Sequence, residues 1–488
     1  METLVKSSPE AQGVDSAAIS AFLDDVNENV QYLHSLILVR HGQTVAEGYW
    51  SPYNPTDPHI MFSLSKSFTS TAVGFAVTEG LLKVTDPVIS FFPDDLPSEV
   101  SENLAAMQVK HLLSMSTGHD EDTTSYLREG VGKTWVQSFL ARPVAYQPGT
   151  FFLYNTGATY MLSAIVQKLT GQTLIEFLKP RLFEPLGIEN PLWEVSPEGI
   201  NTGGFGLSIV TRDIARFGQL YLQKGMWEGK QLIPAAWVEE ASSKHISNGD
   251  DPESDWAQGY GYQFWRCRHG AYRGDGAFGQ YCVVMPEQDA VMAITSGLMD
   301  MQQVLNLVWK HLLPGMKDEA LPSNPSASDA LEEKLKGLAI APVSVGESGA
   351  VAAEVSGKKF AVAENEWGVS EITFDFAQGG GVLNLVEGEE QSQVTFGYGE
   401  WQAGSTTLLH PGPRKYAASA GWSDANTLDL QLYYLTPIFG EGPALGVGLI
   451  PFGLGLAFRF DGDSLTVNVK PSVSFNPDLK INLQGRLA

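Results

Sequence analysis

Two regions of the chain differ in the period at which hydrophobic residues recur. Before about residue 315, segments with apolar residues at helical spacing alternate with short strand-like segments. The helical segments SKSFTSTAVGFAVTEGLL, TGATYMLSAIVQKLTG and TRDIARFGQLYLQKG each meet a glycine at or near the end, as helices commonly do. Strand-like segments lie near both ends of this region, as in SLILVRHGQTVAEGYW and GQYCVVMP. The pattern predicts an α/β (α+β) domain with one sheet built from both ends and helices on its faces.

Beyond residue 340, apolar residues instead recur at every second position. Examples are EITFDF, TLDLQLYYL and SLTVNVK, and glycine-rich or aspartate-rich turns separate such segments. Between the two patterns lies PGMKDEALPSNPSASDA, whose composition is typical of linkers, followed by the short helical pattern LEEKLKGL. We therefore predict an α/β domain over residues 1–315, a linker with a short helix over 316–339, and an antiparallel all-β domain, a barrel or a sandwich, over 340–488.

Length and composition agree with folded cores and exclude some partners. The chain has 488 residues, of which 43% are hydrophobic and 18% are charged, enough for two or three domains. Lysine and arginine number 31 against 56 aspartate and glutamate, which gives a formal net charge of -25. Such an excess repels phosphate backbones and anionic lipid headgroups. We expect no nucleic-acid partner and no membrane partner, and the sequence leaves self-association into a homo-oligomer open.

Few residues are suited to disulfides or metal sites. Cys267 and Cys282 are the two cysteines, so a disulfide framework and a Cys-rich metal site are excluded, and we expect reduced thiols. No HExxH or His-x-His pattern occurs, and we expect neither a metal nor a cofactor. The first residues, METLVKSSPEAQGVD, lack the apolar segment of a signal peptide. This indicates a cytoplasmic protein, although a trimmed secreted chain would look the same.

The segment HIMFSLSKSFTSTAVG places Ser63 and Lys66 three positions apart at the start of a helical pattern. Residues at this spacing share one helix face, so an amine lies beside a hydroxyl. Free N–H groups and the dipole at a helix N-terminus favour developing negative charge and ease deprotonation of the lysine. These are the requirements of a serine nucleophile activated by lysine. Ser356 and Lys359 have the same spacing, but they stand in the polar turn SGKK, which we interpret as solvated.

Two further segments hold candidate groups. In PGTFFLYNTGATYMLSAIVQKLTG, Tyr154 stands just before a helical pattern, where a tyrosine is usually a core or capping residue. In YRGDGAFGQYCVVMP, Gly274, Gly276 and Gly279 have the order of a dinucleotide-binding fingerprint. That fingerprint requires a helix after the turn, whereas the strand-like QYCVVMP follows here. Glycines on a strand instead allow another molecule to approach the backbone closely, as an acyl substrate would.

In this order, Ser63-x-x-Lys66, Tyr154 and the Gly274-x-Gly276 strand resemble the serine β-lactamase and penicillin-recognising superfamily. The resemblance is to its class C-like branch, which contains family VIII carboxylesterases, D-aminopeptidases and 6-aminohexanoate-dimer hydrolases. HLLSMSTGH, RLFEPLGIENPLW and GAFGQYCVVMPEQDAV extend it over about residues 8–315. It implies a β-lactamase/transpeptidase-like domain with an antiparallel sheet flanked by helices. The C-terminal region resembles the lipocalin-like β-barrel domain often appended to these hydrolases.

The resemblance implies a role for each matching residue. Ser63 would be the nucleophile, Lys66 its base partner and Tyr154 a second proton-transferring group. The backbone N–H groups of Ser63 and Ala277 would form the oxyanion hole. Whether Lys66 or Tyr154 is the general base stays open, because their titrations would be coupled.

The first departure from the family pattern follows Tyr154. The family's Tyr-x-Asn is here Tyr154-Asn155-Thr156, so Thr156 replaces the asparagine that contacts a substrate amide in β-lactamases. Asn155 and Thr156 are both candidate substrate-binding residues. His119, in the polar loop STGHDEDT, is a third candidate if that loop borders the site. His59 could form a Ser-His pair with Ser63, but the resemblance assigns that work to other residues.

The second departure lies on the glycine-rich strand. The family's Lys-Thr-Gly is here Gly274-Asp275-Gly276, three further candidate substrate-binding residues. The change removes the cation that holds an antibiotic carboxylate and adds an acid beside its place. Arg273 is adjacent, but strand alternation should point it to the opposite face. A lysine at position 274 should therefore favour β-lactams, provided the backbone tolerates a side chain there.

Together these observations predict a serine hydrolase that cleaves a small ester or amide through an acyl-enzyme on Ser63. Alternatives with the same apparatus are a β-lactamase and a D-amino acid peptidase or amidase, and fold cannot choose among them. The alternative from another class is a catalytically weak, penicillin-binding-like scaffold protein. For the β domain, which lacks a nucleophile motif, we expect a role in shaping access to the site or in an oligomer contact.

Overall fold

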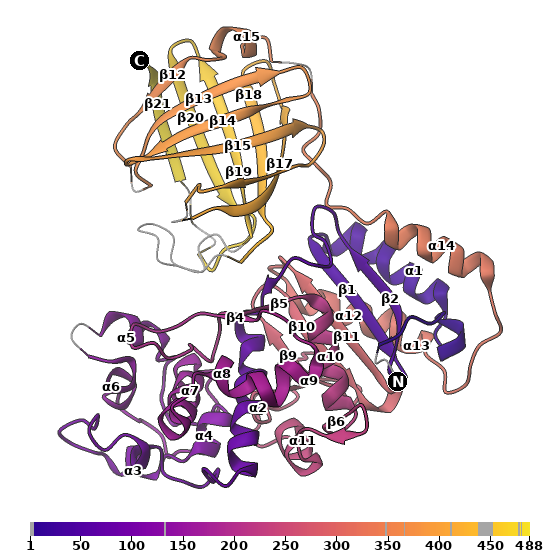
Figure 1. The fold of residues 1–488 in the computed structure, drawn as a ribbon, viewed down its shortest axis with the longest axis vertical. Coiled ribbons are helices and arrows are strands. Elements are labelled where there is room, and N and C mark those ends of the chain that lie inside the picture. Colours follow the sequence, from indigo (N-terminus) through magenta and orange to yellow (C-terminus); the bar gives the residue numbers. More distant parts are fainter. Residues whose placement is uncertain are drawn as a thin grey trace. The chain divides into compact units, whose positions relative to one another are not determined.

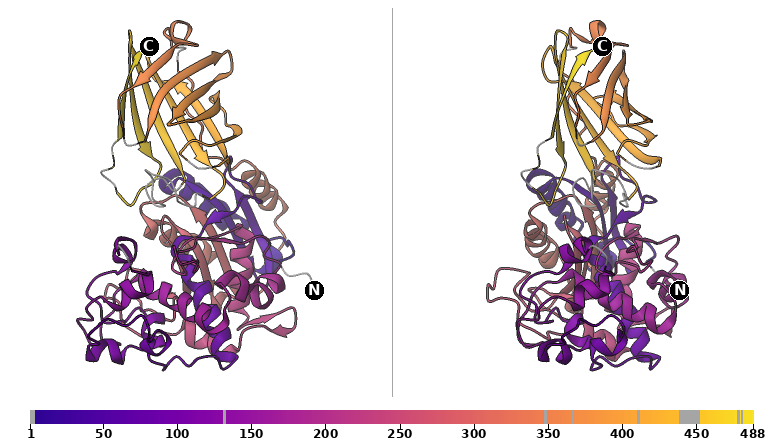
Figure 2. Two further views of the ribbon diagram at one scale, coloured as in Figure 1. Left: turned by 60° about the vertical axis from the view of Figure 1, so that its left-hand side comes forward. Right: turned by 90° about the vertical axis from the view of Figure 1, so that its left-hand side faces the viewer.

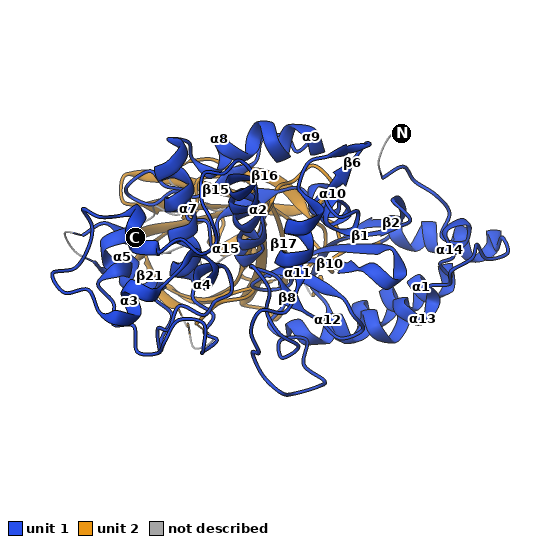
Figure 3. Ribbon diagram, turned by 90° about the horizontal axis from the view of Figure 1, so that it is seen from below, with its two compact units in different colours: residues 1–49, 60–337 blue, residues 50–59, 338–488 orange. Residues whose placement is uncertain are grey.

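The computed structural model describes the chain in two compact units (Figures 1 and 3). Residues 1–49 and 60–337 form the first unit, and residues 50–59 and 338–488 form the second. The residues that the structure describes are 4–130, 133–346, 349–365, 367–409, 412–437, 452–476, 479 and 481–488. The sequence pattern did not predict that residues 50–59 group with the C-terminal unit.

The first unit is built on a six-stranded antiparallel sheet with the order β2-β1-β11-β10-β9-β8. Its strands come from both ends of the unit, as predicted: β1 Leu33–Arg40, β2 Gln43–Tyr49, β8 Trp265–Arg266, β9 Tyr272–Gly276, β10 Gln280–Met285 and β11 Ala290–Ser296. Helix α10 (Thr211–Leu222) packs on this sheet. Gly218 permits the close approach, because a side chain there would meet Val291 and Cys282.

A helical lobe lies beside the sheet (Figure 2). Its centre is α2, of which every residue from Ser65 to Ala76 is buried, and α7 packs against it. The helices of the unit are α1 Ser16–Asp25, α2 Ser65–Thr78, α3 Glu102–Ala106, α4 Val109–Leu113, α5 Thr124–Glu129, α6 Trp135–Leu140, α7 Thr156–Thr170, α8 Leu174–Leu178, α9 Glu184–Leu186, α10 Thr211–Leu222, α11 Ala235–Ser242, α12 Met301–Leu307, α13 Leu313–Gly315 and α14 Pro325–Lys336. Short strands are β4 Leu192–Trp193, β5 Leu207–Ile209, β6 Met226–Trp227 and β7 Lys230–Gln231.

The predicted linker region contributes to the first unit. Helix α14 packs on α1, where Lys334 donates to Asp24 Oδ1 at 2.6 Å and to the Ser20 carbonyl at 3.2 Å. Cys267 and Cys282 are free and buried, which agrees with the predicted reduced thiols. Over the described ranges, no helix combines the length and apolarity required to cross a membrane.

The second unit is a closed barrel of nine strands, which confirms the predicted all-β domain. The strands of the unit are β12 Lys359–Val362, β13 Val369–Ala377, β14 Gly380–Glu387, β15 Glu390–Tyr398, β16 Gln402–Thr406, β17 Arg414–Trp422, β18 Thr427–Tyr434, β19 Gly453–Asp461, β20 Ser464–Pro471 and β21 Ile481–Leu487. A parallel pairing of β15 with β17 closes the ring, and β16 pairs beside β17. The short helix α15 (Ala352–Val355) precedes β12.

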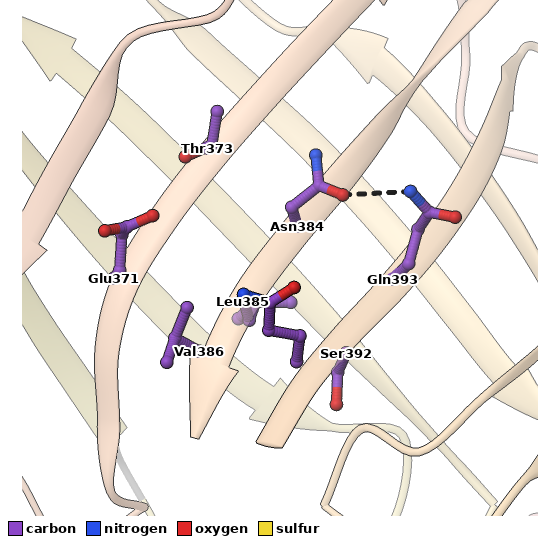
Figure 4. Close-up of a pocket in the computed structure, with 8 residues that line it drawn as sticks. Glu371, Thr373, Asn384, Leu385, Val386, Ser392 and Gln393 are labelled. Carbon is purple, nitrogen blue, oxygen red and sulfur yellow. Dashed lines mark hydrogen bonds between the residues drawn. The ribbon is translucent and has the colours of Figure 1, made fainter. Parts of the chain in front are cut away.

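Aromatic rings fill the interior of the barrel. Phe374 meets Phe458 edge to face at 4.9 Å and stacks on Phe376 at 5.2 Å. A hollow of about 380 Å³ lies instead over β13, β14 and β15 (Figure 4). Its lining is mainly polar side chains that alternate with the core residues of these strands: Glu371, Thr373, Asn384, Leu385, Val386, Gln391, Ser392 and Gln393. The described hollow thus lies on the second unit, and its lining includes Leu385 of the barrel core.

Residues 50–59 pack within the barrel unit. The Tyr53 ring lies 6.0 Å from that of Tyr433, and the His59 ring lies 4.8 Å from that of Phe452. Ser51 exchanges two backbone hydrogen bonds with residues 338 and 340. The chain therefore leaves the second unit at His59, only four positions before Ser63.

Candidate active site

Ser63 lies on a single 3₁₀ turn, Phe62–Leu64, directly before α2. The turn is held from both sides, because the Met61 N–H donates to the Leu207 carbonyl at 2.8 Å and the Ser65 hydroxyl accepts from the Leu207 N–H at 3.1 Å. Phe62 and Leu64 are buried, whereas Ser63 is partly exposed. The local structure thus presents one hydroxyl to solvent at the N-terminal end of a buried helix.

Lys66, one turn along, is 1% exposed and directed at this hydroxyl. Its Nζ donates to Ser63 Oγ at 2.9 Å, to Thr156 Oγ1 at 3.1 Å and to the Gly204 carbonyl at 2.8 Å. Burial lowers the pKa of the Lys66 ammonium to about 7, while the charges of Asp122 and Asp275 act in the opposite direction. A substantial fraction of Lys66 is therefore neutral near pH 7 and able to accept a proton.

Tyr154 lies close to both Ser63 and Lys66, two residues before α7. Lys66 Nζ is 4.8 Å from the centre of its ring, and the ring stacks on Trp265 at 5.2 Å. Burial raises the pKa of the Tyr154 phenol well above its ordinary value, and a hydrogen bond with Ser63 acts in the opposite direction. Tyr154 therefore remains a neutral phenol at pH 7, suited to donating a proton rather than to starting as an anionic base.

The end of β9 lies against the turn that carries Ser63. At Gly276 a side chain would collide with the Met61 carbonyl, so this approach requires glycine. The Gly276 carbonyl accepts from the Gly279 N–H at 3.1 Å, and the Ala277 carbonyl accepts from Gln280 Nε2 at 3.0 Å. These bonds fix the peptide planes on both sides of Ala277, the residue predicted to supply the second oxyanion donor.

Gly274 and its neighbours divide between the two faces of β9. A Cβ at Gly274 would lie 2.5 Å from Leu64 Cδ1 and from Ser67 Oγ, so this position faces packed side chains at the start of α2. Arg273 and Asp275 lie on the opposite face, where Nη2 of Arg273 is 2.8 Å from Oδ2 of Asp275. The alternation predicted for Arg273 agrees with this arrangement. However, the acid expected beside the missing cation is compensated by the buried guanidinium.

This packing changes the expectation for a lysine at position 274. Gly274→Ala should lower the free energy of unfolding by about 1 to 3 kcal/mol, because a methyl group overpacks the contact with Leu64 and Ser67. Gly274→Lys should be worse and should not gain β-lactam turnover. Denaturant unfolding measures this, with Gly379→Ala as the control, since nothing lies within 4 Å of a Cβ there. Equal stability of both alanine variants would contradict the packing argument.

The three remaining candidates take different positions. Thr156 reaches the site through its bond to Lys66, and its N–H donates to Asp122 Oδ1 at 3.0 Å. Asn155 is fully buried, and its Oδ1 accepts from the Thr123 N–H at 3.2 Å and hydroxyl at 2.8 Å. His119 is 2% exposed, and its Nδ1 is 2.9 Å from the Thr117 hydroxyl. The structure thus brings Thr156 to Lys66, whereas Asn155 and His119 pack in the helical lobe.

Comparison with known proteins identifies the family. The family model described as Beta-lactamase matches residues 26–306, which is more than half of the chain. The chain belongs to the beta-lactamase family. Within it, the match to the 6-aminohexanoate-dimer hydrolase of Paenarthrobacter ureafaciens is 24% identical over 306 residues, covering 58% of this chain and 78% of that protein.

Other proteins that this chain resembles have names that denote different activities. The lovastatin esterase of Penicillium rubens is 28% identical over 174 residues, covering 30% of this chain and 42% of that protein. The D-aminopeptidase of Brucella anthropi is 25% identical, covering 36% of this chain and 35% of that protein. The solved structure of EstCE1, titled a hydrolase with promiscuous acyltransferase activity, has a TM-score of 0.51 at 13% identity, covering 62% of this chain and 99% of that one. That likeness supports the beta-lactamase fold of the first unit.

Sequence reasoning missed three groups at this candidate site. The Gly204 carbonyl is one of three acceptors for Lys66, Trp265 stacks on Tyr154, and Asp122 accepts from the Thr156 N–H. Trp265 stands in the aromatic segment FWRCR, whose pattern indicates only a sheet face packed on helices. The glycine run GGFG around Gly204 is a signal of close backbone approach, but nothing in it indicates which side chain approaches.

Proposed function

We propose that this protein is a serine hydrolase that cleaves a small ester or amide through an acyl-enzyme on Ser63. The observation that carries the proposal is the 2.9 Å bond between Lys66 Nζ and a partly exposed Ser63 hydroxyl. A nucleophile, a base within hydrogen-bond reach and groups that orient the base are what such catalysis requires. Membership of the beta-lactamase family supports the same class of chemistry.

The geometry favours Lys66 as the general base in acylation. Neutral Lys66 takes the Ser63 proton as Oγ attacks the substrate carbonyl, and the oxyanion accepts from the N–H groups of Ser63 and Ala277. Tyr154 then protonates the leaving group and regains a proton from Lys66. In deacylation, a water molecule gives a proton to the Lys66–Tyr154 pair as it attacks the acyl carbonyl. The pair then returns a proton to Ser63 Oγ, which leaves as the free hydroxyl. Each oxyanion donor contributes roughly 10²- to 10³-fold in kcat.

A proton-accepting Lys66 makes activity depend on pH. Below a pKa of about 7 the lysine is mainly protonated and cannot act as a base, so kcat/KM should fall about tenfold per pH unit on the acid side and level off above pH 7. The measurement is the initial rate of p-nitrophenyl ester hydrolysis from pH 5.5 to 8.5. A profile that is flat across this range, or that falls as the pH rises, would argue against Lys66 as the base.

The surroundings of the site favour a substrate less anionic than a β-lactam acid. Position 274 supplies no cation, and the Arg273 guanidinium is fully buried and ion-paired with Asp275. We therefore propose ester or linear amide hydrolysis above β-lactam hydrolysis, with a β-lactamase and a D-amino acid amidase as alternatives. Within the lobe, Asn155 and His119 act on substrate only indirectly, by shaping the loop before α7.

Side-by-side rates test this proposal. The panel contains short-chain p-nitrophenyl esters, linear amides, D-amino acid amides and nitrocefin. Efficient nitrocefin turnover with poor ester turnover would reverse the order. A serine-reactive fluorophosphonate separates an enzyme from a catalytically weak scaffold, because an active hydrolase is labelled at one serine and a scaffold is not.

A further inference from the structure

Two phenylalanines flank the proposed oxyanion donors along the chain. Phe62 immediately precedes Ser63, and Phe278 immediately follows Ala277. Both have left-handed backbone conformations, with φ of 44° at Phe62 and 64° at Phe278. Bulky residues rarely adopt this region, where each costs on the order of 1 kcal/mol or more. Two such residues beside the two proposed donors indicate that the surrounding structure holds this conformation in place.

The rings of these residues contact each other. Their centres are 5.4 Å apart and their planes are at 76°, an edge-to-face arrangement. Phe62 is 5% exposed and Phe278 is 4% exposed, so the pair is a packing contact rather than an open surface for substrate. Edge-to-face pairs of this kind contribute about 0.5 to 1.5 kcal/mol beyond the burial of their area.

The ring pair joins two turns in which backbone hydrogen bonds already set the orientation of the peptide planes. The Phe62 carbonyl accepts from the Ser65 N–H, and the Gly276 carbonyl accepts from the Gly279 N–H. In a trans peptide the N–H points opposite to the carbonyl. The N–H groups of Ser63 and Ala277 therefore point away from these two hydrogen bonds.

Each turn is also anchored on its own side. The Phe278 carbonyl accepts from the Ser296 hydroxyl at 2.9 Å and from the Leu298 N–H at 2.9 Å, which ties its turn to β11. On the other side, the bond from Met61 to the Leu207 carbonyl ties the Phe62 turn to β5. The contact between Phe62 and Phe278 is a direct side-chain link between the two anchored turns.

We propose that Phe62 and Phe278 are positioning residues that fix the separation and direction of the two N–H donors of the oxyanion hole. The inference rests on the proposed function, since it assigns these residues to the acylation step on Ser63. Loss of either ring should allow the two turns to move relative to each other. A displacement near 1 Å can cost about 10²-fold in rate when it misplaces a catalytic group.

The test replaces each ring, in the whole 488-residue chain, by leucine or by methionine. Phe62→Leu, Phe62→Met, Phe278→Leu and Phe278→Met should each lower kcat for the best ester by about 10- to 10²-fold, with KM changed less than about threefold. The double Leu variant should be little worse than either single variant, because one contact is lost in each case. The inhibition constant of an alkyl boronic acid, whose tetrahedral adduct places an oxygen in the hole, should rise by a similar factor.

Two controls separate positioning from stability. Phe22→Leu removes a fully buried ring from α1 and should lower Tm without lowering kcat. Phe62→Gly permits the left-handed backbone but lacks the ring, so its kcat should fall as in the Leu variant. Wild-type kcat in Phe62→Gly, or Leu and Met variants with lowered Tm but unchanged kcat and boronate affinity, would overturn the positioning role. Absence of labelling and turnover in the wild-type protein would instead overturn the proposed function itself.

Discussion

Ser63→Ala should abolish turnover, with kcat reduced on the order of 10⁴- to 10⁶-fold, and should remove all labelling by a fluorophosphonate. No other residue can supply the attacking oxygen if the acyl-enzyme forms on Ser63. The change removes one hydroxyl from a partly exposed side chain, and Lys66 keeps its bonds to Thr156 and the Gly204 carbonyl. Tm should therefore remain close to that of the wild type. Mass spectrometry of the labelled protein and a steady-state rate assay provide the two measurements.

The chain contains a matched control for this experiment. Ser356 and Lys359 repeat the Ser-x-x-Lys spacing in the barrel unit, but Lys359 pairs with Glu371 at 3.0 Å and the Ser356 hydroxyl accepts from the Phe376 N–H at 3.0 Å. Ser356→Ala should leave labelling and turnover unchanged. Persistent labelling of Ser63→Ala at a different serine would refute the assignment of the nucleophile.

The architecture follows from hydrophobic periodicity because period 3.6 and period 2 separate cleanly in this chain. A sheet built from strands at both ends of the first unit and an all-β second unit were both predicted, whereas β11 was not predicted individually. The grouping of residues 50–59 with the second unit was not predicted, because WSPYNPTDPH has no periodic pattern that indicates which core it joins. Its place is decided by contacts such as those of Tyr53 with Tyr433 and His59 with Phe452, which lie far apart in the sequence.

At the site, residues close in sequence were easier to predict than residues brought together by folding. Ser63 and Lys66 stand three positions apart where a helical pattern begins, and their bond follows from this spacing together with the helix. The Gly204 carbonyl and the Trp265 ring reach the same site from distant segments. The expectation for a lysine at position 274 depended on space for a side chain. Strand alternation gave the faces correctly but could not show that the Gly274 face packs on Leu64 and Ser67.

A short stretch of chain connects the barrel unit to the turn that carries Ser63. Because residues 50–59 are packed within the second unit, the chain is anchored there until four positions before Ser63. Removing residues 338–488 would leave Tyr53 and His59 without the aromatic partners Tyr433 and Phe452. A simple truncation therefore changes the segment leading to Ser63 as well as removing a domain, and its effect on substrate preference cannot be assigned to the barrel alone.

Lys66 and Tyr154 should behave as one proton-transferring unit. Lys66→Met keeps the buried length of the side chain but removes the amine, and Tyr154→Phe keeps the ring on Trp265 but removes the phenol. Each should lower kcat by at least about 10²-fold, since general acid–base assistance contributes about 10²- to 10⁴-fold. The double variant should be little worse than the worse single variant, because either loss interrupts the same transfer.

The pH profiles of the two single variants then assign the base. Tyr154→Phe should keep the rise in kcat/KM through about pH 7, since Lys66 still titrates, although loss of the phenol can displace its midpoint. Lys66→Met should lose that rise. Of the two proton-transferring groups only Tyr154 then remains, and its pKa lies far above neutrality. Thr156→Val is the matched control: it removes one of three acceptors of Lys66 and should affect kcat far less than loss of the amine. If Tyr154→Phe abolished the rise and Lys66→Met retained it, the general base would be Tyr154; if Tyr154→Phe had wild-type kcat, the ring would serve only in packing.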